Sequence, residues 1–352
     1  MKRFKSIAIA AFVVLAAASA MPALPANAAS SASLSIVPKK NYTIEPGKSA
    51  KDTLTIRNLD ETEDLDLSLR VVDFTYNDDG GTPKLFLAED APQTTWSLKP
   101  FLTVPKSVTI PPKSSKVLDI NVTIPAGQGA GSYYSAIVYS TGAADGGNVG
   151  LSASGVTLVF TSIPGTVKEE LRLEKFGAYN LATAEKKAGY TFITSTKPEA
   201  IAYTLKNNGN VTEAPVGTIT LKHMFGKEQQ ITDVNPNGSL AIIGQTRTFT
   251  TCIKSQAQEV EFNGSTSQSS ACSTSPNLWP GMYTAKLDVF YGQNGNNTQE
   301  IVSSATFWYL PWWFVITFLV VLAVIAFAVW RLVVKVRRRM YGSRYRKSTR
   351  RR

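Results

Sequence analysis

The chain has 352 residues, of which 37 are lysine or arginine and 26 are aspartate or glutamate, so its net charge is +11. A charge of this size would suit a nucleic-acid-binding protein if it were spread over the chain. However, residues 331–352 hold eleven basic residues and residues 1–28 hold three, with no acidic residue in either segment, and residues 29–330 sum to −3. The body of the protein is therefore slightly acidic, and we expect no nucleic-acid partner.

The N-terminus has the pattern of a secretory signal peptide. A basic start, Lys2–Lys5, precedes the apolar run Ile7–Ala18, and Ala26 and Ala28 supply the small residues of a cleavage site. An uncleaved membrane anchor is the alternative, but the run is shorter than the roughly 20 residues that a spanning helix needs. We therefore assign residues 1–28 to a signal peptide.

Residues 29–311 alternate between apolar and polar side chains with a period of two and contain no long stretch of helical period. Short alternating segments separated by Gly, Pro and Asp turns are typical of β-sandwich domains. A segment of this length is enough for about two domains. The clearest predicted strands are Leu34–Ile36, Thr53–Arg57, Leu65–Leu69, Val117–Val122, Tyr133–Tyr139, Ile201–Asn207, Gly217–Lys222 and Thr284–Tyr291.

Two sequence features occur once in each half of this segment. A predicted strand ends in Asn58 in the first half and in Asn207 in the second, and each is followed by a polar turn. Near the end of each half, a Gly-x-Tyr triplet that starts at Gly131 or Gly281 opens another strand. Glycine permits a tight turn at such a position, and the tyrosine can cover the end of the sandwich.

This repeat predicts an all-β fold of two tandem immunoglobulin-like β-sandwich domains, residues 29–165 and 166–306, joined at Pro164-Gly165. The segment Gly142–Gly155 is rich in Gly, Ala and Ser. It is either a long hairpin loop, which we favour, or a hinge.

The two cysteines, Cys252 and Cys272, lie in the part of the chain that we expect to be secreted, so a disulfide between them is the favoured interpretation and free thiols the alternative. Closing a loop of about 20 residues stabilises a fold by roughly 3 kcal/mol. The enclosed segment Ser265–Ser270 would be flexible without this bond. A catalytic cysteine is not expected, because the chain has one histidine, His223, on a strand-like run. This count also argues against a His-based zinc site and a Ser-His-Asp triad.

Two acidic segments, Asp60–Asp66 between two strands and Asn77–Gly81 in a predicted hairpin turn, are interpreted as solvated loops. Calcium binding is the alternative, because hard cations take carboxylate oxygens from such loops, but the ligand spacing matches no defined calcium loop. Counting carboxylates leaves glycoside hydrolysis open. We expect no catalytic residue, no metal and no cofactor.

A transmembrane helix is predicted at Trp312–Trp330, which is apolar except for Thr317 and has tryptophans at both ends. A buried core helix is the alternative. No basic residue occurs in 292–311, whereas residues 331–352 are strongly basic. The positive-inside rule therefore predicts a single-pass plasma-membrane protein with an extracellular ectodomain and a cytoplasmic C-terminal tail. The tail itself is expected to contact anionic lipid, with a cytoplasmic partner as the alternative.

The layout resembles that of the WxL-interacting proteins of Gram-positive cell surfaces. The resemblance is carried by Tyr42–Gly47 leading into Thr53–Asn58, by Ile110-Pro-Pro-Lys113 and Ile124-Pro125 before a glycine-rich turn, and by the second sandwich, the span and the basic tail. It implies a peptidoglycan-binding immunoglobulin-like domain, a second immunoglobulin-like domain and a membrane anchor. No ligand contact is transferred to an individual residue.

These observations lead us to expect a non-catalytic, membrane-anchored surface protein whose ectodomain binds cell-wall glycan or partner surface proteins. The alternatives are an assembly or scaffold subunit of a membrane complex and, less favoured, a cell-wall hydrolase. The ligand-binding residues are not predicted by the sequence.

Overall fold

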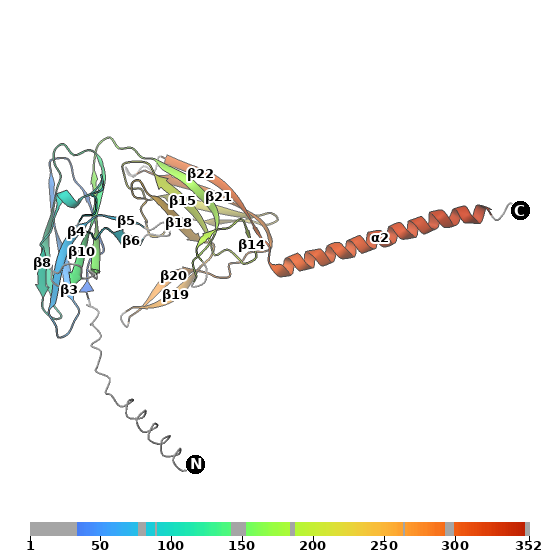
Figure 1. The fold of residues 1–352 in the computed structure, drawn as a ribbon, viewed down its shortest axis with the longest axis horizontal. Helices are drawn as coiled ribbons and strands as arrows, with labels where there is room; N and C mark the ends of the chain where they lie inside the picture. The colour runs from blue at the N-terminus through green and yellow to red at the C-terminus, as the bar shows by residue number, and fades with distance from the viewer. Residues whose placement is uncertain are drawn as a thin grey trace, which may run out of the picture.

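A computed structural model describes residues 34–76, 82–88, 90–141, 153–183, 187–262, 265–292 and 299–348. It contains two β-sandwich domains in series, followed by one long helix that extends away from the second domain (Figure 1). The predicted fold class is confirmed. The predicted signal peptide, residues 1–28, lies outside the described residues, as does the predicted turn Asn77–Gly81.

The first domain packs a four-stranded sheet, in the order β1-β3-β9-β7, against a five-stranded sheet, in the order β2-β11-β10-β4-β8. The neighbours are antiparallel except for β2, which runs parallel to β11 at one edge of the second sheet. The strands are β1 (Leu34–Ser35), β2 (Lys39–Thr43), β3 (Ser49–Asn58), β4 (Leu65–Val72), β7 (Leu102–Thr103), β8 (Ser107–Ile110), β9 (Ser115–Thr123), β10 (Gly131–Thr141) and β11 (Ala153–Ile163). A short 3-10 helix, η1 (Lys99–Phe101), precedes β7, and β5 (Phe74–Tyr76) and β6 (Pro83–Leu85) form a separate ribbon.

The second domain repeats this plan, with one sheet in the order β13-β12-β15-β18 and another in the order β14-β22-β21-β16-β17. Here β14 takes the place of β2 and runs parallel to β22 at the sheet edge. The strands are β12 (Leu171–Asn180), β13 (Gly189–Tyr190), β14 (Ile193–Thr194), β15 (Ala200–Asn207), β16 (Val216–His223), β17 (Glu228–Ile231), β18 (Thr246–Cys252), β21 (Gly281–Tyr291) and β22 (Gln299–Tyr309).

Alternating side chains of the facing sheets form one apolar core in each domain. Ile56, Ile120 and Ile137 are fully or nearly fully buried in the first core, and Tyr203 and Leu287 are fully buried in the second. The period-two pattern in the sequence is therefore the inside–outside alternation of these strands.

The asparagine at the end of β3 or β15 has the same role in each domain. Asn58 is fully buried and donates hydrogen bonds to the carbonyl oxygens of Glu63 and Ile110, at 2.9 and 3.0 Å. Asn207 is also fully buried and donates to the carbonyl oxygens of Val211 and Ala241, at 2.7 and 2.8 Å. In both cases the side-chain oxygen accepts a bond from the backbone two residues later. The asparagine thus replaces backbone partners where the strand turns away from its sheet.

The Gly-x-Tyr triplet also forms the same structure twice. Tyr133 donates a hydrogen bond to the carbonyl of Gly129, and Tyr283 donates one to the carbonyl of Trp279, in each case four residues earlier. The preceding glycines have positive φ angles, 145° at Gly131 and 139° at Gly281. Each tyrosine therefore fixes the turn that leads into the long strand β10 or β21.

Cys252 and Cys272 form a disulfide, the pairing that the sequence predicts. The enclosed segment is a β-hairpin of β19 (Ser255–Phe262) and β20 (Ser265–Cys272), which projects from the body of the second domain (Figure 1). Strands β10 and β11 are antiparallel neighbours in one sheet. The segment between them, 142–152, to which the prediction of a hairpin loop or a hinge applies, lies outside the described residues.

The C-terminal helix, α2 (Trp312–Ser348), is longer than the predicted span, because it continues from Trp330 into the basic segment. Its stretch Trp312–Met340 is the one described helix that is long and apolar enough to cross a membrane, and none of its most apolar part is buried in the protein. These properties are consistent with a single membrane span and not with a core helix.

Candidate binding site between the two domains

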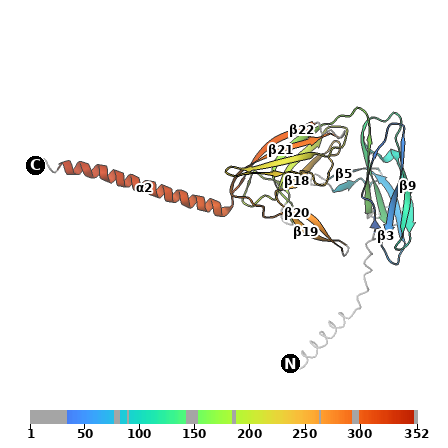
Figure 2. The ribbon, with the colours of Figure 1, turned by 180° about the vertical axis from the view of Figure 1, so that it is seen from behind.

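The two domains share a small apolar core of their own. Phe74, Tyr134 and Phe160 of the first domain pack in one cluster with Ile242 and Ile243 of the second. The rings of Phe74, Tyr134 and Phe160 lie 5.3–5.8 Å apart. Figure 2 shows β5 on the side of the first domain that faces the second. Such shared apolar burial resists independent motion of the domains.

Hydrogen bonds between the two domains fix their relative position at this interface. The backbone N–H of Ser132 donates to the carbonyl of Asn210 at 3.0 Å, and Asn210 Nδ2 donates to the carbonyl of Ala130 at 3.1 Å. The N–H of Thr212 donates to Ser132 Oγ at 3.0 Å. A Cβ atom at Gly131 would lie 2.6 Å from the carbonyl oxygen of Asn210, so only glycine permits this approach.

An arginine closes the other side of the interface. The guanidinium of Arg247 lies 4.6 Å from the ring centre of Tyr76 in the first domain and donates to the carbonyl of Leu240 at 2.6 Å. Burial is the main cause of its lowered pKa. A desolvated cation over an aromatic ring is a strong contact, so we regard the interdomain arrangement as preformed.

A pocket of about 420 Å³ lies beside this interface, within the size range of small-ligand sites. Strand β2 supplies one wall through Lys39, Asn41 and Thr43, which alternate with the residues that face the first core. The remaining walls come from both domains: Ser132, Phe160, Thr161, Ser162, Thr212, Glu213, Ala214, Leu240 and Gly292. Neither domain alone therefore builds the pocket.

Glu213 is the most unusual residue of this pocket, because its side chain is only 2% exposed. One carboxylate oxygen, Oε2, accepts a hydrogen bond from the N–H of Gly292 at 3.2 Å. The other, Oε1, is buried and finds no hydrogen-bond partner among the described residues. Burial first, and then the nearby charge of Glu169, raise the pKa of Glu213 to about 7. A buried acceptor without a partner is costly, so rotation of this carboxyl group toward the pocket to meet a hydrogen-bond donor of a ligand would be favoured.

The domain repeat shows that a carboxyl group is not needed at this position for folding. In the first domain, Asn58 donates to the carbonyl of Ile110, which pairs with Leu65. In the second, Asn207 donates to the carbonyl of Ala241, which pairs with Glu213. Glu213 therefore occupies the place of the buried Leu65, and it lies where the second domain meets the pocket.

The rest of the lining combines a cation, an aromatic ring and several hydroxyl groups. Lys39 Nζ lies 4.9 Å from the ring centre of Phe160, and desolvation lowers its pKa. Asn41 and the Ser and Thr side chains offer both donors and acceptors. This chemistry suits a neutral ligand with many hydroxyl or amide groups.

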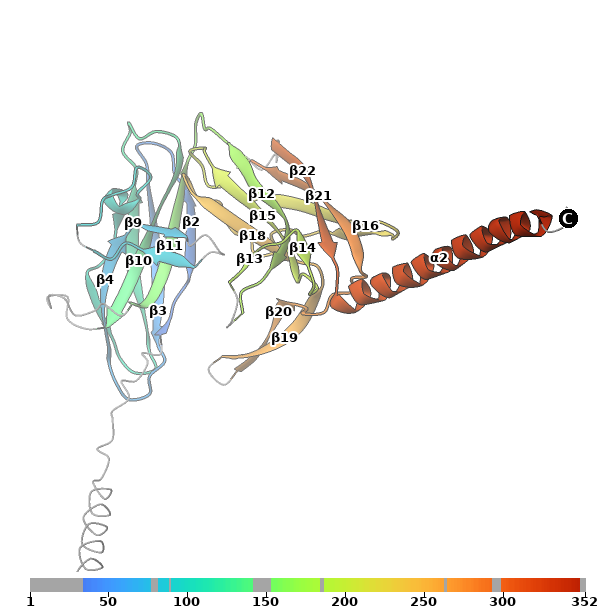
Figure 3. The ribbon, with the colours of Figure 1, turned by 45° about the vertical axis from the view of Figure 1, so that its right-hand side comes forward.

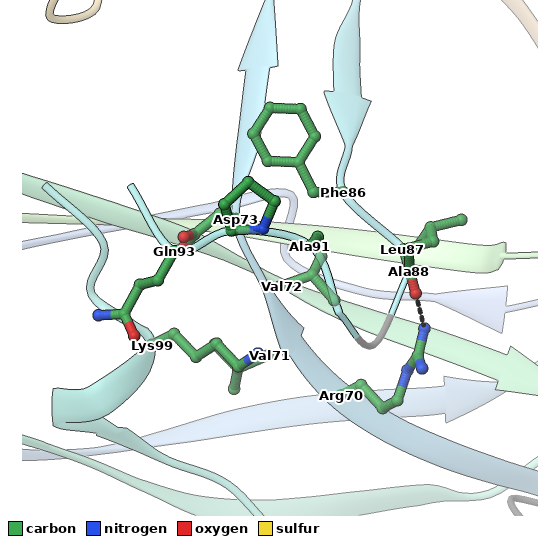
Figure 4. A pocket seen from close by; sticks show the side chains of 11 residues that line it. Arg70, Val71, Val72, Asp73, Phe86, Leu87, Ala88, Ala91, Gln93 and Lys99 are labelled. Atoms are coloured by element: carbon green, nitrogen blue, oxygen red, sulfur yellow. Dashed lines mark hydrogen bonds between the residues drawn. The ribbon is translucent and has the colours of Figure 1, made fainter. Parts of the chain in front are cut away.

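A second cavity, of about 260 Å³, lies in the first domain near η1 (Figure 4). Arg70 donates to the carbonyl of Leu87 on one side of it, and Gln93 and Lys99 lie on the other. Asp73 accepts hydrogen bonds from Ser97 Oγ at 2.6 Å and Ser135 Oγ at 3.0 Å. Since the Asp73 carboxylate and the Arg70 guanidinium already bind protein groups, we do not propose this cavity as a ligand site.

The residues singled out from the sequence lie outside the interdomain pocket. His223 ends β16, where its ring packs against Tyr283 and its Nε2 lies 3.2 Å from the carbonyl of Pro280. Asp60 accepts backbone hydrogen bonds from Thr62 and Glu63, which lower its pKa. Within the described residues, no group of three or more His, Cys, Asp or Glu side chains could hold a metal ion.

The sequence did not predict the pocket, because its residues belong to no motif. The alternation of Lys39, Asn41 and Thr43 in β2 was visible, but any half-exposed strand has it. The one informative signal was Glu213, which falls where the repeat requires an apolar residue. That signal needs an alignment of the two domains through Asn58 and Asn207.

No protein-family model matches the sequence, and no curated protein sequence matches it. The structure is distantly similar to solved structures of chaperones. The class 5 fimbriae chaperone CfaA has 13% identity and a TM-score of 0.33, with 79% of this chain and 99% of that chain covered. The chaperone CupB2 of Pseudomonas aeruginosa has 8% identity and a TM-score of 0.29 (76% and 97% covered), and DraB of E. coli has 16% and 0.29 (62% and 98% covered). TM-scores this low do not support a shared function.

Proposed function

We propose that this protein is a non-catalytic, membrane-anchored surface protein that binds cell-wall glycan in the pocket between its two domains. The observation that carries the proposal is the buried Glu213 carboxylate, whose Oε1 has no partner among the described residues and which lies in a pocket lined by hydroxyl and amide groups. Sugar hydroxyls and N-acetyl groups would supply the donors and acceptors that such a lining can match.

The proposed orientation places both domains outside the cell and the C-terminus inside. It rests on the basic residues that follow the apolar part of α2 and on their absence from 292–311. The resemblance to the WxL-interacting proteins supports peptidoglycan as the polymer. A domain pair held at the membrane would then tether it to the overlying wall.

A non-catalytic role is supported by the composition of the pocket. Hydrolysis of a glycosidic bond ordinarily requires two carboxyl groups flanking that bond. Among the described residues that line the pocket, Glu213 is the one carboxylate. We therefore expect binding without turnover, and release of new reducing ends from peptidoglycan by the purified protein would contradict this part of the proposal.

Co-sedimentation of the full chain, held in nanodiscs, with purified peptidoglycan tests the proposal. We expect retention of the wild type and about tenfold weaker binding for Asn41→Ala and for Glu213→Gln. The matched control is Asn121→Ala, on β9 in the other sheet of the first domain, which should bind as the wild type does. Equal retention of all four proteins would reject the pocket as the site, and no retention of the wild type would reject glycan binding.

A partner protein that adds a strand to β2 is the second candidate. Among the described strands, β2 lies at a sheet edge and pairs with β11 alone. The bonds at its ends use the Pro38 carbonyl and the Ile44 N–H. By alternation, the backbone groups of Lys39, Asn41 and Thr43 then point away from β11. An exposed edge of this kind accepts extended peptides.

Two variants distinguish the two candidates. Thr43→Pro removes an outward N–H while leaving the bonds to β11 intact, so it should abolish crosslinking to a surface protein on intact cells if strand addition is the function. Because Thr43 also lines the pocket, the second variant is Glu213→Gln, which leaves the backbone of β2 unchanged. Glu213→Gln should keep that crosslinking if strand addition is the function, and it should weaken peptidoglycan retention if the glycan is the ligand.

A further inference from the structure

The second domain exposes large apolar side chains at the end from which α2 departs. Phe225 is 86% exposed and Trp279 is 75% exposed, values that a solvated domain rarely tolerates together. Phe192, Ile193 and Met224 are exposed as well. We refer to these five residues, Phe192, Ile193, Met224, Phe225 and Trp279, as the apolar rim.

The strand register places the rim at one level of the domain. Tyr309, the last residue of β22, pairs with Gly281 on one side and with Thr194 on the other. The N–H of Met224 donates to the carbonyl of Met282, the neighbour of Gly281. Because adjacent strands lie about 4.8 Å apart, the turns that carry the rim residues surround the end of β22. Figure 3 shows β16 ending on the side of the domain from which α2 leaves.

The connection from this domain to the helix is too short to separate the rim from the membrane. Only Leu310 and Pro311 lie between β22 and α2. Two extended residues span at most about 7 Å. Pro311 is buried and Phe314 is half-buried, so the first helical turn packs against the domain. The bilayer surface therefore lies at the level of the rim whenever α2 crosses the membrane.

The charges around the rim suit the same environment. Lys197, Lys227 and Lys254 lie between strands at this end, together with Glu199, while Lys222 of β16 forms an ion pair with Glu228 of β17. Lysines near a membrane surface attract anionic headgroups, and tryptophans are enriched where apolar and polar regions of the bilayer meet. Trp312 and Trp313 at the start of α2 are exposed at the same level.

We propose that the apolar rim inserts into the interfacial layer of the bilayer and forms a second membrane contact beside α2. The occupant of this surface is thus phospholipid. The contact would fix the tilt of the second domain, and through the rigid interdomain interface it would hold the first domain at a set distance from the membrane. The proposal depends on α2 crossing the membrane and does not depend on glycan binding.

Depth-dependent quenching tests it on the full chain in vesicles of phosphatidylcholine and phosphatidylglycerol. A polarity-sensitive fluorophore is attached to Phe225→Cys, and lipids with a nitroxide either near the headgroup or in the middle of the acyl chain serve as quenchers. Val117→Cys is the matched control, because this apolar residue is 60% exposed but lies on β9 of the first domain. We expect at least threefold stronger quenching at position 225 than at position 117.

Two further variants make every outcome decisive. A label at Ala323→Cys, within the apolar part of α2, reports insertion of the helix through the acyl-chain quencher. Quenching at position 323 without quenching at position 225 would overturn the proposed insertion of the apolar rim. No quenching at position 323 would overturn both the membrane span and the insertion of the rim. A label at Trp279→Cys should lose at least half of its quenching when Phe225→Asp is added. Quenching between labels on separate copies, without lipid quenching, would show a protein interface and would also overturn the proposal.

Discussion

The same end of the same fold has different surroundings in the two domains. In the first domain, the turn before Tyr133 is covered by the second domain, where Gly131 lies against the carbonyl of Asn210. In the second domain, the turn before Tyr283 exposes Trp279 and lies beside the start of α2. The domains are therefore stacked head to tail. The end that carries the Gly-x-Tyr turn is covered by the second domain in the first domain, and it is not covered by another domain in the second.

This comparison separates the residues that stabilise the fold from the residues that are candidates for a function. The asparagine and the Gly-x-Tyr turn are present in both domains and form the same hydrogen bonds, so they serve folding. Glu213 in place of Leu65 and the apolar rim occur only in the second domain, so they are the features that require a functional explanation.

The largest effect is expected at the two buried asparagines. Asn58→Ala and Asn207→Ala should each lower the free energy of unfolding by about 4 kcal/mol, because each removes two hydrogen bonds to backbone carbonyls and one from a backbone N–H. Asn207→Ala should also weaken the interdomain contact, since the turn that follows it carries Asn210. Urea unfolding with hydrogen exchange to locate the affected domain measures both effects.

The control for this pair is Asn237→Ala, an exposed asparagine in the second domain, which should change stability by less than about 0.5 kcal/mol. If Asn58→Ala released the interdomain contact as strongly as Asn207→Ala does, the head-to-tail arrangement described above would be wrong.

Substitutions of Gly131 and Gly281, the glycines of the two Gly-x-Tyr triplets, should distinguish the covered end of the first domain from the open end of the second. Gly131→Ala should lower the free energy of unfolding by about 3 kcal/mol, since it adds strain at a positive φ to a clash with the backbone oxygen of Asn210. Gly281→Ala should lower it by about 2 kcal/mol, because its Cβ would meet the side chain of His223 instead. Thermal unfolding of both variants checks the order.

A second substitution tests the cause of this difference. His223→Ala should restore about 1 kcal/mol to Gly281→Ala, because the clash is with a side chain that can be removed. No side-chain removal can relieve the backbone clash at Gly131, so Asn210→Ala in the Gly131→Ala background should give no recovery.

The pH dependence of stability should distinguish Glu213 from its counterpart Leu65. The pKa of Glu213 is about 7 in the folded protein and 4.5 in the unfolded chain, so the folded state holds the proton more tightly between these values. Stability therefore falls as pH rises through this window, by about 2 kcal/mol between pH 5 and pH 8. Glu213→Leu should remove this part of the pH dependence in urea titrations at the two pH values. An unchanged pH profile in Glu213→Leu would mean that the carboxyl group is solvated and not buried.

The fold could be predicted from the sequence to a large extent, because strand alternation, glycine turns and the apolar span depend on local order along the chain. The repeat of Asn58 and Asn207 was visible, but its hydrogen bonds to Ile110 and Ala241 were not, since they join segments 52 and 34 residues apart. The hairpin within the disulfide loop was not predicted because its second strand, β20, is rich in Ser and Thr and lacks an apolar face.

The binding pocket could not be predicted, for a different reason. Its walls come from β2, from the start of β10, from the end of β11 and from the turn after Asn207, and the stacking of the domains brings them together. Domain stacking depends on the close approach at Gly131 and on Arg247 over Tyr76. Neither contact has a sequence signature, because each joins ordinary residues across two domains.

The smallest expected effect compares the two tyrosines. Tyr133→Phe and Tyr283→Phe should each lower the free energy of unfolding by about 1 kcal/mol, since each loses the hydroxyl that binds its turn. The local consequences should differ. Tyr133→Phe frees a turn that the second domain still covers, so amide exchange there should change little. Tyr283 also accepts the N–H of Trp279 at 2.8 Å, so Tyr283→Phe should speed exchange in the turn that carries Trp279. That increase should be largest in detergent and smaller in vesicles, because insertion of the rim into the bilayer would hold the turn in place. Equal exchange in detergent and in vesicles would indicate that the open end of the second domain has no partner in the membrane.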